Sequence, residues 1–286
     1  LNSISGVTRW QPQVGTGGTA NNSFFSVNFG QRGLTYTPPT GFVALSGTTV
    51  TVEDQNLELP NWVWIKNRDA TDDHKLFTTL RGVQKSLEPN EATDEADEPN
   101  TLVDFNKNGF TVGNDVTVNT NGEDYVAWCW ANISESWSND ASATGIGDYD
   151  SSGIRGRKTG ISIFTYAGRG TGSTSIRNKF AHGLVDENGT AVIPELFWFK
   201  GLDTGTTYGA WLIQGNAFDN GGSGGGDILK LDTNAARISN AASTNTQWTN
   251  QWVELDYSRS ANLNGTDNIC FAFRSVEGFS KIGTYI

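Results

Sequence analysis

Short runs of apolar residues, each bounded by Gly, Asn, Asp or Pro, recur along the chain. The clearest run covers residues 125–130 and follows the turn pair Asn121-Gly122. Apolar side chains occupy both sets of alternating positions in this run, so both faces of a strand there would be apolar. The pattern predicts a strand that is buried on both sides, in the middle of a β-sandwich rather than at the edge of a sheet.

The same pattern returns near the end of the chain. Residues 264–273 again begin with Asn-Gly, carry Asp two positions later, and place Phe where the first run has Trp128 and Trp130. A second pair of matching runs, 60–66 and 194–200, has Pro, then apolar residues around a Trp, then Lys. We therefore predict a duplicated module, and repeated β-rich modules are typical of elongated fibres or surface arrays.

Turn signals between many short strands predict an all-β fold made of tandem antiparallel β-sandwich modules of the jelly-roll or concanavalin-like kind. The predicted division is an N-terminal β segment at 1–48, module 1 at 50–135, a Ser-, Gly- and Asp-rich linker at 136–158, module 2 at 159–275, and the start of a further strand or module at 276–286.

Composition narrows the classes of partner. The net charge of −11 over 286 residues disfavours a nucleic-acid groove or an anionic membrane surface as partner. No run of 18 apolar residues is present, so we expect no membrane insertion. The chain lacks an initial Met and ends inside a strand-like run, so we expect a piece of a longer protein. Cys129 and Cys270 fall in different copies of the repeat and are expected to be buried thiols rather than a disulfide.

Several separated motifs in module 1 resemble a known group of proteins. Trp-Ile-Lys-Asn-Arg, Thr-Leu-Arg-Gly, Asn-Gly-Phe-Thr-Val-Gly and Tyr-Val-Ala-Trp-Cys-Trp lie in this order between residues 64 and 130. Together they resemble an uncharacterised module that repeats in tail-fibre and other virion proteins of marine bacteriophages and cyanophages. Residues 28–45, with Asn-Phe-Gly-Gln-Arg and then Tyr-Thr-Pro-Pro-Thr-Gly-Phe, look like the C-terminal end of SPRY-like, concanavalin-type phage domains. The resemblance makes residues 1–48 the end of such a domain.

What the resemblance implies is context rather than chemistry. We expect a non-enzymatic, structural, host-facing component of a bacteriophage virion, most readily a tail-fibre segment. It would be made in the host bacterial cytoplasm, assemble as a homo-oligomer with a trimer favoured, contact other virion proteins, and bind a host surface glycan. Two alternatives stay open: a capsid decoration or fibre protein, and an array of carbohydrate-binding modules from a secreted polysaccharide-degrading protein.

Aromatic residues outside the clear strands are the candidates for glycan binding. Sugar rings stack on flat aromatic faces, and neighbouring Asn, Asp and Gln side chains can bind their hydroxyl groups. Packing in the core or between subunits is the competing interpretation, since most Trp residues bury most of their surface. The candidates are Tyr208, Trp211, Trp248 and Trp252.

Calcium is the only cofactor that the sequence suggests. Asp148, Asp150 and Ser152 place oxygen atoms at positions 1, 3 and 5 of a string with Gly at position 6, as in a calcium loop. Turn residues alone also produce such a string. The acidic stretch 88–98 has carboxylates for a cation, but we interpret it as a solvated surface loop. The glycine-rich stretch 221–226 predicts a hairpin tip.

The sequence offers little for catalysis. His74 and His182 are the two histidines, each without a second ligand at metal spacing. No nucleophile elbow or phosphate loop is present. Asp124 and Asp267 occupy the same position of the two copies, where a hydrogen bond that stabilises the turn is the natural role.

Overall fold

The computed structural model describes residues 50–53, 59–170, 177–216, 227–238, 247–256 and 260–283. In these ranges the only helices are single turns, α1 (Val116–Asn119) and α2 (Ala141–Thr144), and every pairing between named strands is antiparallel. The expected all-β sandwich architecture is confirmed. The predicted SPRY-like segment 1–48 and the glycine-rich stretch 221–226 lie outside the described residues.

Two sheets of three strands form the first copy of the repeat, which we call copy 1 (residues 50–131). One sheet has the order β1-β7-β6 and the other has the order β3-β2-β8. The strands are β1 (Val50–Glu53), β2 (Pro60–Asn67), β3 (Lys75–Thr78), β6 (Leu102–Asn106), β7 (Gly109–Val112) and β8 (Tyr125–Ala131).

The second copy, copy 2 (residues 178–273), repeats this arrangement strand for strand. Its sheets contain the orders β12-β17-β16 and β14-β13-β18, which match β1-β7-β6 and β3-β2-β8 in sequence order and in space. The strands are β12 (Asn178–Ala181), β13 (Leu196–Gly201), β14 (Leu212–Gly215), β16 (Gln247–Trp248), β17 (Trp252–Leu255) and β18 (Asp267–Phe273). The sequence repeat is therefore a repeat of a two-sheet unit.

The register of the strand pairs β2-β8 and β13-β18 agrees with this equivalence. Trp64 lies opposite Trp128 in copy 1, and Trp198 lies opposite Phe271 in copy 2. The turn before the last strand is also built in the same way. The main-chain N–H of Asp124 donates to the carboxylate of Asp69 (2.6 Å), and the N–H of Asp267 donates to the carboxylate of Asp203 (2.8 Å).

Residues between the copies widen the sheet of copy 2. The full order is β15-β14-β13-β18-β11-β10-β9, with β9 (Glu135–Asn139), β10 (Ser151–Gly156), β11 (Ile161–Ala167) and β15 (Leu229–Lys230). The prediction of a linker at 136–158 is wrong, because two of these strands and α2 fall in it. Small residues allow these strands to pack closely against their neighbours. A Cβ atom on Gly153 would lie only 2.1 Å from the carbonyl oxygen of Ile163.

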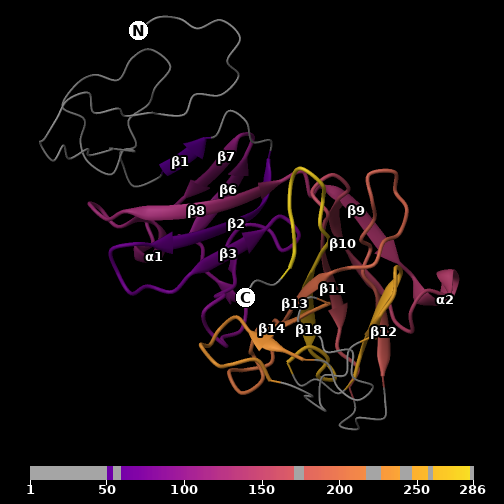
Figure 1. Cartoon of the computed structure of the whole chain (residues 1–286). Helices are drawn as coiled ribbons and strands as arrows, with labels where there is room; N and C mark the ends of the chain where they lie inside the picture. Colours follow the sequence, from indigo (N-terminus) through magenta and orange to yellow (C-terminus); the bar gives the residue numbers. More distant parts are fainter. Residues whose placement is uncertain are drawn as a thin grey trace, which may run out of the picture.

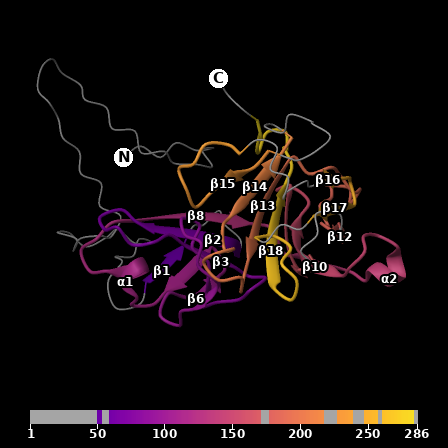
Figure 2. The same ribbon diagram turned by 90° about the horizontal axis from the view of Figure 1, so that it is seen from below.

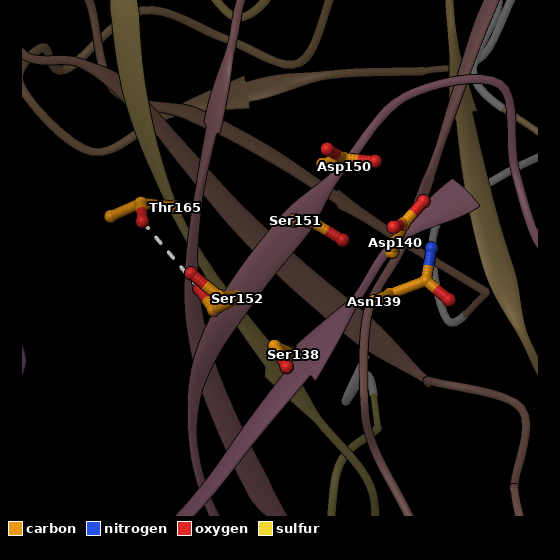
Figure 3. A pocket seen from close by; sticks show the side chains of 7 residues that line it. All are labelled: Ser138, Asn139, Asp140, Asp150, Ser151, Ser152 and Thr165. Atoms are coloured by element: carbon orange, nitrogen blue, oxygen red, sulfur yellow. Dashed lines mark hydrogen bonds between the residues drawn. The ribbon is translucent and has the colours of Figure 1, made fainter. Parts of the chain in front are cut away.

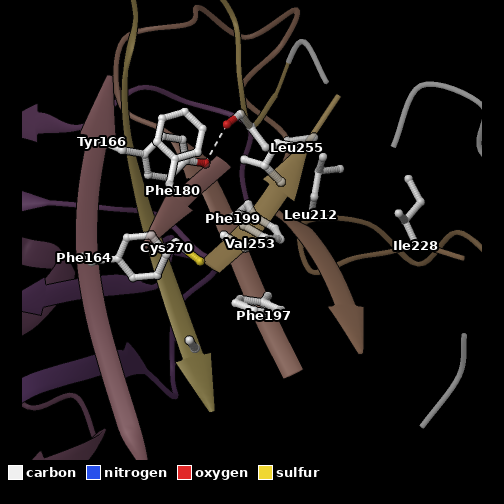
Figure 4. Packing of buried hydrophobic residues seen from close by; sticks show 13 residues of the cluster. Phe164, Tyr166, Phe180, Phe197, Phe199, Leu212, Ile228, Val253, Leu255 and Cys270 are labelled. Atoms are coloured by element: carbon white, nitrogen blue, oxygen red, sulfur yellow. Dashed lines mark hydrogen bonds between the residues drawn. The ribbon is translucent and has the colours of Figure 1, made fainter. Parts of the chain in front are cut away.

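The four sheets of three or more strands lie in layers (Figures 1 and 2). Three apolar cores hold these layers together. Val63 and Phe110 belong to the core inside copy 1, and Phe199 and Val253 belong to the core inside copy 2 (Figure 4). The middle core joins the two copies. It contains Trp62, Leu76, Leu87, Ile133, Ile154, Ile161, Ile163, Leu202, Trp211, Ile269 and Phe271, with Trp64, Trp130, Trp198 and Phe273 packed against it.

The two matching strands β8 and β18 differ in their surroundings. β18 lies between β13 and β11 and is buried from Asn268 to Ala272, whereas β8 is the last described strand of its sheet. The expectation that residues 125–130 form a doubly buried central strand is wrong for β8, where Trp128 is 44% exposed, and it describes β18 instead. Cys129 and Cys270 form no disulfide; Cys270 is buried and Cys129 is half-buried.

The acidic stretch 88–98 is part of the folded junction between the copies. It includes β5 (Ala96–Asp97), which pairs with β4 (Lys85–Ser86) in a small two-stranded sheet. The indole N–H of Trp211 donates to the carbonyl oxygen of Glu88 (2.9 Å), and the N–H of Glu95 donates to that of Leu202 (2.9 Å). The interpretation as a solvated loop is therefore wrong, because most of its carboxylates and parts of its main chain have partners within the protein.

At the C-terminal end, the described residues form a turn rather than a named strand. Val276 and Ser280 make an isolated antiparallel bridge. The predicted start of a further strand or module at 276–286 continues into residues 284–286, which lie outside the described residues.

Candidate functional site

A hollow on the described surface lies beside α2. Its volume is about 370 Å³, and an adjoining hollow of about 290 Å³ lies over β9 and β10 (Figure 3). Carboxylate, hydroxyl, phenol and guanidinium groups line the larger one. Its lining residues are Asp140, Ala141, Ser142, Asp148, Tyr149, Asp150, Ala167 and Arg169.

Hydrogen bonds to the main chain hold the acidic side chains of this hollow. Asp140 caps α2 and accepts from the N–H of Ala143 (3.1 Å), while Asp150 accepts from the N–H of Ala141 (2.9 Å). Together with the hydroxyl of Ser142, which is the largest cause, the Ala143 bond lowers the pKa of Asp140. Both carboxylates are therefore fixed in position, and that of Asp140 is charged at neutral pH.

Tyr149 supplies an aromatic surface between the two carboxylates. Its side chain is 36% exposed, and the guanidinium of Arg169 lies 5.2 Å from the ring centre. The other neighbour of the ring is Phe180 of β12, at 6.0 Å between centroids. An exposed ring with charged hydrogen-bonding groups around it suits a sugar, whose apolar face stacks while its hydroxyl groups bind carboxylates.

The predicted calcium residues fall in these hollows but do not form a calcium loop. Asp148 uses one carboxylate oxygen to accept from the N–H of Lys179 (3.0 Å), and Asp150 turns toward α2. Ser152 belongs to β10, where its carbonyl oxygen accepts from Thr165. Within the described ranges, no three His, Cys, Asp or Glu side chains are grouped so that they can hold a metal ion. Calcium binding here stays a prediction without a geometric argument.

The four predicted glycan-binding aromatics do not share one surface. Trp211 is wrong as a stacking residue, because it is 0% exposed and packs in the middle core. Tyr208 is half-buried and lies on the loop that precedes Trp211. Trp248 contacts Phe197 edge to face at 5.4 Å and packs against the core of copy 2. Trp252 lies on β17, with the ammonium group of Lys179 4.8 Å from its ring centre.

The comparisons with known proteins give one match. Residues 42–286 match the family described as a domain of unknown function, DUF7483. The chain belongs to this family. Neither the curated proteins nor the solved structures gave a match. The DUF7483 match covers both copies and the strands between them, and it leaves residues 1–41 outside.

The two histidines have structural roles in this DUF7483 chain. His182 is buried, accepts the N–H of Leu184 on Nδ1 (3.1 Å) and lies 3.1 Å from the carbonyl oxygen of Thr249 through Nε2. Burial lowers its pKa from 6.5 to about 4, so the ring is neutral. His74 accepts from the indole N–H of Trp64 (2.8 Å).

Lys200 is another titratable group whose pKa is strongly shifted. Burial lowers its pKa to about 8. Its ammonium group donates to the carbonyl oxygen of Gly209, and its side chain has no exposed surface, so no substrate reaches it. As to membranes, the described part of the chain contains no helix that is both long and apolar enough to cross one.

Sequence reasoning did not pick out Tyr149 or Arg169 as site residues. The available signal was the string Asp-Tyr-Asp at residues 148–150, in which an aromatic residue lies between two acids. In the calcium interpretation its acids bind a cation and its ring has no role. Arg169 could not be found in the same way, because it reaches the hollow from the end of β11, 20 positions along the chain.

Proposed function

We propose that this protein is a structural, host-facing component of a bacteriophage virion, with the tail fibre as its location and a homotrimer as its assembly. The observation that supports the proposal most directly is the repetition of a complete two-sheet unit within one chain. The copies stack through a shared aromatic core, so they form one continuous folded unit rather than separate domains joined by a linker. Such an array suits a load-bearing, extended particle component.

The hollow beside α2 is the proposed contact with a host glycan. In this proposal Tyr149 stacks on the apolar face of a sugar ring. Asp140 and Asp148 accept hydrogen bonds from its hydroxyl groups, and Arg169 binds a carboxylate if the sugar is acidic. Stacking and charge-assisted hydrogen bonds on one open, shallow surface give the weak single-site affinity that a trimer multiplies by presenting three copies.

Mass spectrometry of purified virions and of the infected-cell lysate tests the location. We expect peptides of this chain in the purified particle and antibody labelling at the tail in electron micrographs. Presence in the lysate together with absence from the particle would contradict the virion assignment. Labelling over the capsid would favour the decoration protein. The mass of the purified chain in solution tests the trimer, and a monomer at every concentration contradicts it.

A glycan array with host surface polysaccharides tests the contact separately. Tyr149→Ala should reduce binding at least tenfold. Trp252→Ala, which changes an aromatic residue on the neighbouring β17, is the matched control and should leave binding within about twofold. Equal loss in both variants, or no binding by the unaltered chain, would contradict the proposed site without bearing on the virion location.

A further inference from the structure

The duplication places two Asn-Gly pairs in the same turn of the two copies. Asn121-Gly122 precedes β8, and Asn264-Gly265 precedes β18. The turns span residues 120–123 and 263–266, and in each the last N–H donates to the first carbonyl oxygen (3.3 Å). The φ angles of the two glycines are 88° and 81°, which a type II turn requires at its third residue. The two Asn-Gly pairs therefore have equivalent places in equivalent turns.

The side chains of Asn121 and Asn264 are also alike in their surroundings. Both are exposed, and neither carboxamide makes a hydrogen bond to another described residue. An Asn side chain reacts with the main chain most readily before Gly, because Gly has no Cβ to shield its nitrogen atom. By sequence and exposure alone, the two asparagines are equally reactive.

The main-chain hydrogen bonds of the two glycines are different. The N–H of Gly265 donates to the carbonyl oxygen of Gly168 (3.2 Å), directly after β11, and the N–H of Gly168 donates back to the carbonyl oxygen of Thr266 (2.7 Å). The N–H of Gly122 donates to no group among the described residues. The nitrogen atom of Gly122 is therefore free to approach the side chain of Asn121, whereas that of Gly265 is held in place.

We propose that Asn121 is a site of spontaneous deamidation and that it reacts faster than the other Asn-Gly pairs of the described chain. The nitrogen atom of Gly122 attacks the carboxamide carbon of Asn121, and a new C–N bond forms while the bond to the side-chain NH₂ group breaks. Ammonia leaves with the proton of the Gly122 nitrogen, and a five-membered succinimide remains. Water then opens this ring at either carbonyl group and gives aspartate or isoaspartate. The net reaction consumes one water and releases one ammonia.

The two remaining Asn-Gly pairs of the described chain, at 108–109 and 188–189, are also held. Gly109 is buried and belongs to the β6-β7 ladder. The N–H of Gly189 donates to the carbonyl oxygen of Asp186 (3.1 Å). Among the described pairs, only Asn121 combines an exposed side chain with a following nitrogen atom that has no partner.

The reaction changes the charge and the geometry at the start of β8. Either product adds a carboxylate two residues before Glu123, and isoaspartate lengthens the main chain of the turn by one carbon atom. The turn is fixed to the neighbouring loop by two bonds. The N–H of Asp124 donates to the carboxylate of Asp69 (2.6 Å), and the N–H of Arg68 donates to the carbonyl oxygen of Asp124 (2.8 Å). We expect deamidation to weaken both bonds.

Ageing of the full chain at mildly alkaline pH, followed by mass spectrometry of its peptides, tests the proposal. The loss of one main-chain hydrogen bond changes an equilibrium by about fivefold, and two such bonds hold the turn of copy 2. Asn121 should therefore deamidate at least about fivefold faster than Asn264. Asn121→Gln should remove the reaction at this position, because glutamine forms a larger ring more slowly, and should leave the rate at Asn264 unchanged. The amide of Asp124 should exchange its hydrogen at least threefold faster in the deamidated fraction.

The same measurement in concentrated urea controls for intrinsic reactivity. Both asparagines precede Gly, so in the unfolded chain their rates should agree within about twofold. Equal rates in the folded protein overturn the proposal, as does faster reaction of Asn108 or Asn188 than of Asn121. A fivefold difference that persists in urea also overturns it, because the fold is then not the cause. Unchanged exchange of the Asp124 amide contradicts the effect on the turn.

Discussion

Trp62 and Trp130 stack face to face across β2 and β8, with ring centroids 3.8 Å apart and planes within 17°. Trp62 also contacts Phe271 of copy 2 at 5.1 Å, so the stack connects the two copies. Trp130→Ala should lower the free energy of unfolding by about 3 kcal/mol, because it leaves a cavity beside a buried indole. Trp128→Ala, two residues along the same strand, should cost less than half as much. Urea denaturation of both variants measures the difference, and equal losses would contradict the role of the stack.

The shared middle core predicts that both copies unfold together. A core with side chains from both copies cannot survive the loss of either one, so unfolding should be a single cooperative transition. Phe110→Ala, deep inside copy 1, should therefore lower the denaturation midpoint of copy 2 by the same amount as that of copy 1. Hydrogen exchange of β8 and of β18 in increasing denaturant follows each copy separately. Two separated transitions would contradict a shared core.

The buried ammonium group of Lys75 predicts a costly substitution at the junction. Burial opposes its charge, but hydrogen bonds to Glu88 and Glu98, both at 2.7 Å, outweigh this and raise its pKa. Lys75→Met leaves two carboxylates without their cation and should cost about 3 kcal/mol in thermal or chemical unfolding. Lys85→Met removes the exposed pair with Asp97 and should cost less than about 1 kcal/mol. Similar losses of stability in both variants would show that burial gives the ion pairs of Lys75 no additional contribution to stability.

His182 predicts acid sensitivity. Its pKa is 6.5 in an unfolded chain and about 4 in the fold. As the pH falls from 6.5 toward 4, the unfolded chain takes up the proton first, so stability decreases over this window by up to about 3 kcal/mol. Free energies of unfolding at pH 7 and pH 4.5 measure the decrease.

Two substitutions separate this contribution from those of the carboxylates. His182→Gln should be less stable at pH 7, because the bonds to Leu184 and Thr249 are disturbed, but it should lose less stability on acidification. His74→Gln should keep most of the acid dependence of the unaltered chain. An unchanged pH dependence in His182→Gln would contradict the assignment.

The alternation of apolar residues was sufficient to predict most strands and the duplication. The strands around Trp62, Trp198 and Phe271 fall where the pattern places them, because each has a core side chain at every second position. β9 and β10 were missed, since Ser and Gly are typical of loops when nothing indicates close packing. The position of β8 in its sheet was also missed, because β8 and β18 have the same pattern and differ only in their neighbours.

The site was less predictable than the fold. Trp211 is a residue type that is typical of binding sites, but its indole N–H donates to the main chain of Glu88, 123 positions earlier in the sequence. Asp148 and Asp150 matched the spacing of calcium ligands, but their carboxylates bond to main-chain N–H groups of other segments. Spacing along the chain shows which groups are available, whereas the direction of each side chain depends on contacts between distant strands.

The meeting of Trp64 with Trp198 has an evolutionary consequence. These residues occupy the same position in the two copies, and their rings contact each other edge to face at 6.2 Å. Contact between equivalent positions is what a twofold axis produces when identical subunits pair through the same face. The chain thus has the form of a homodimer whose two subunits are joined in one chain through β9, β10 and β11. Once fused, each half could change on its own, and the Trp-rich face of one half now fits the Phe-rich face of the other.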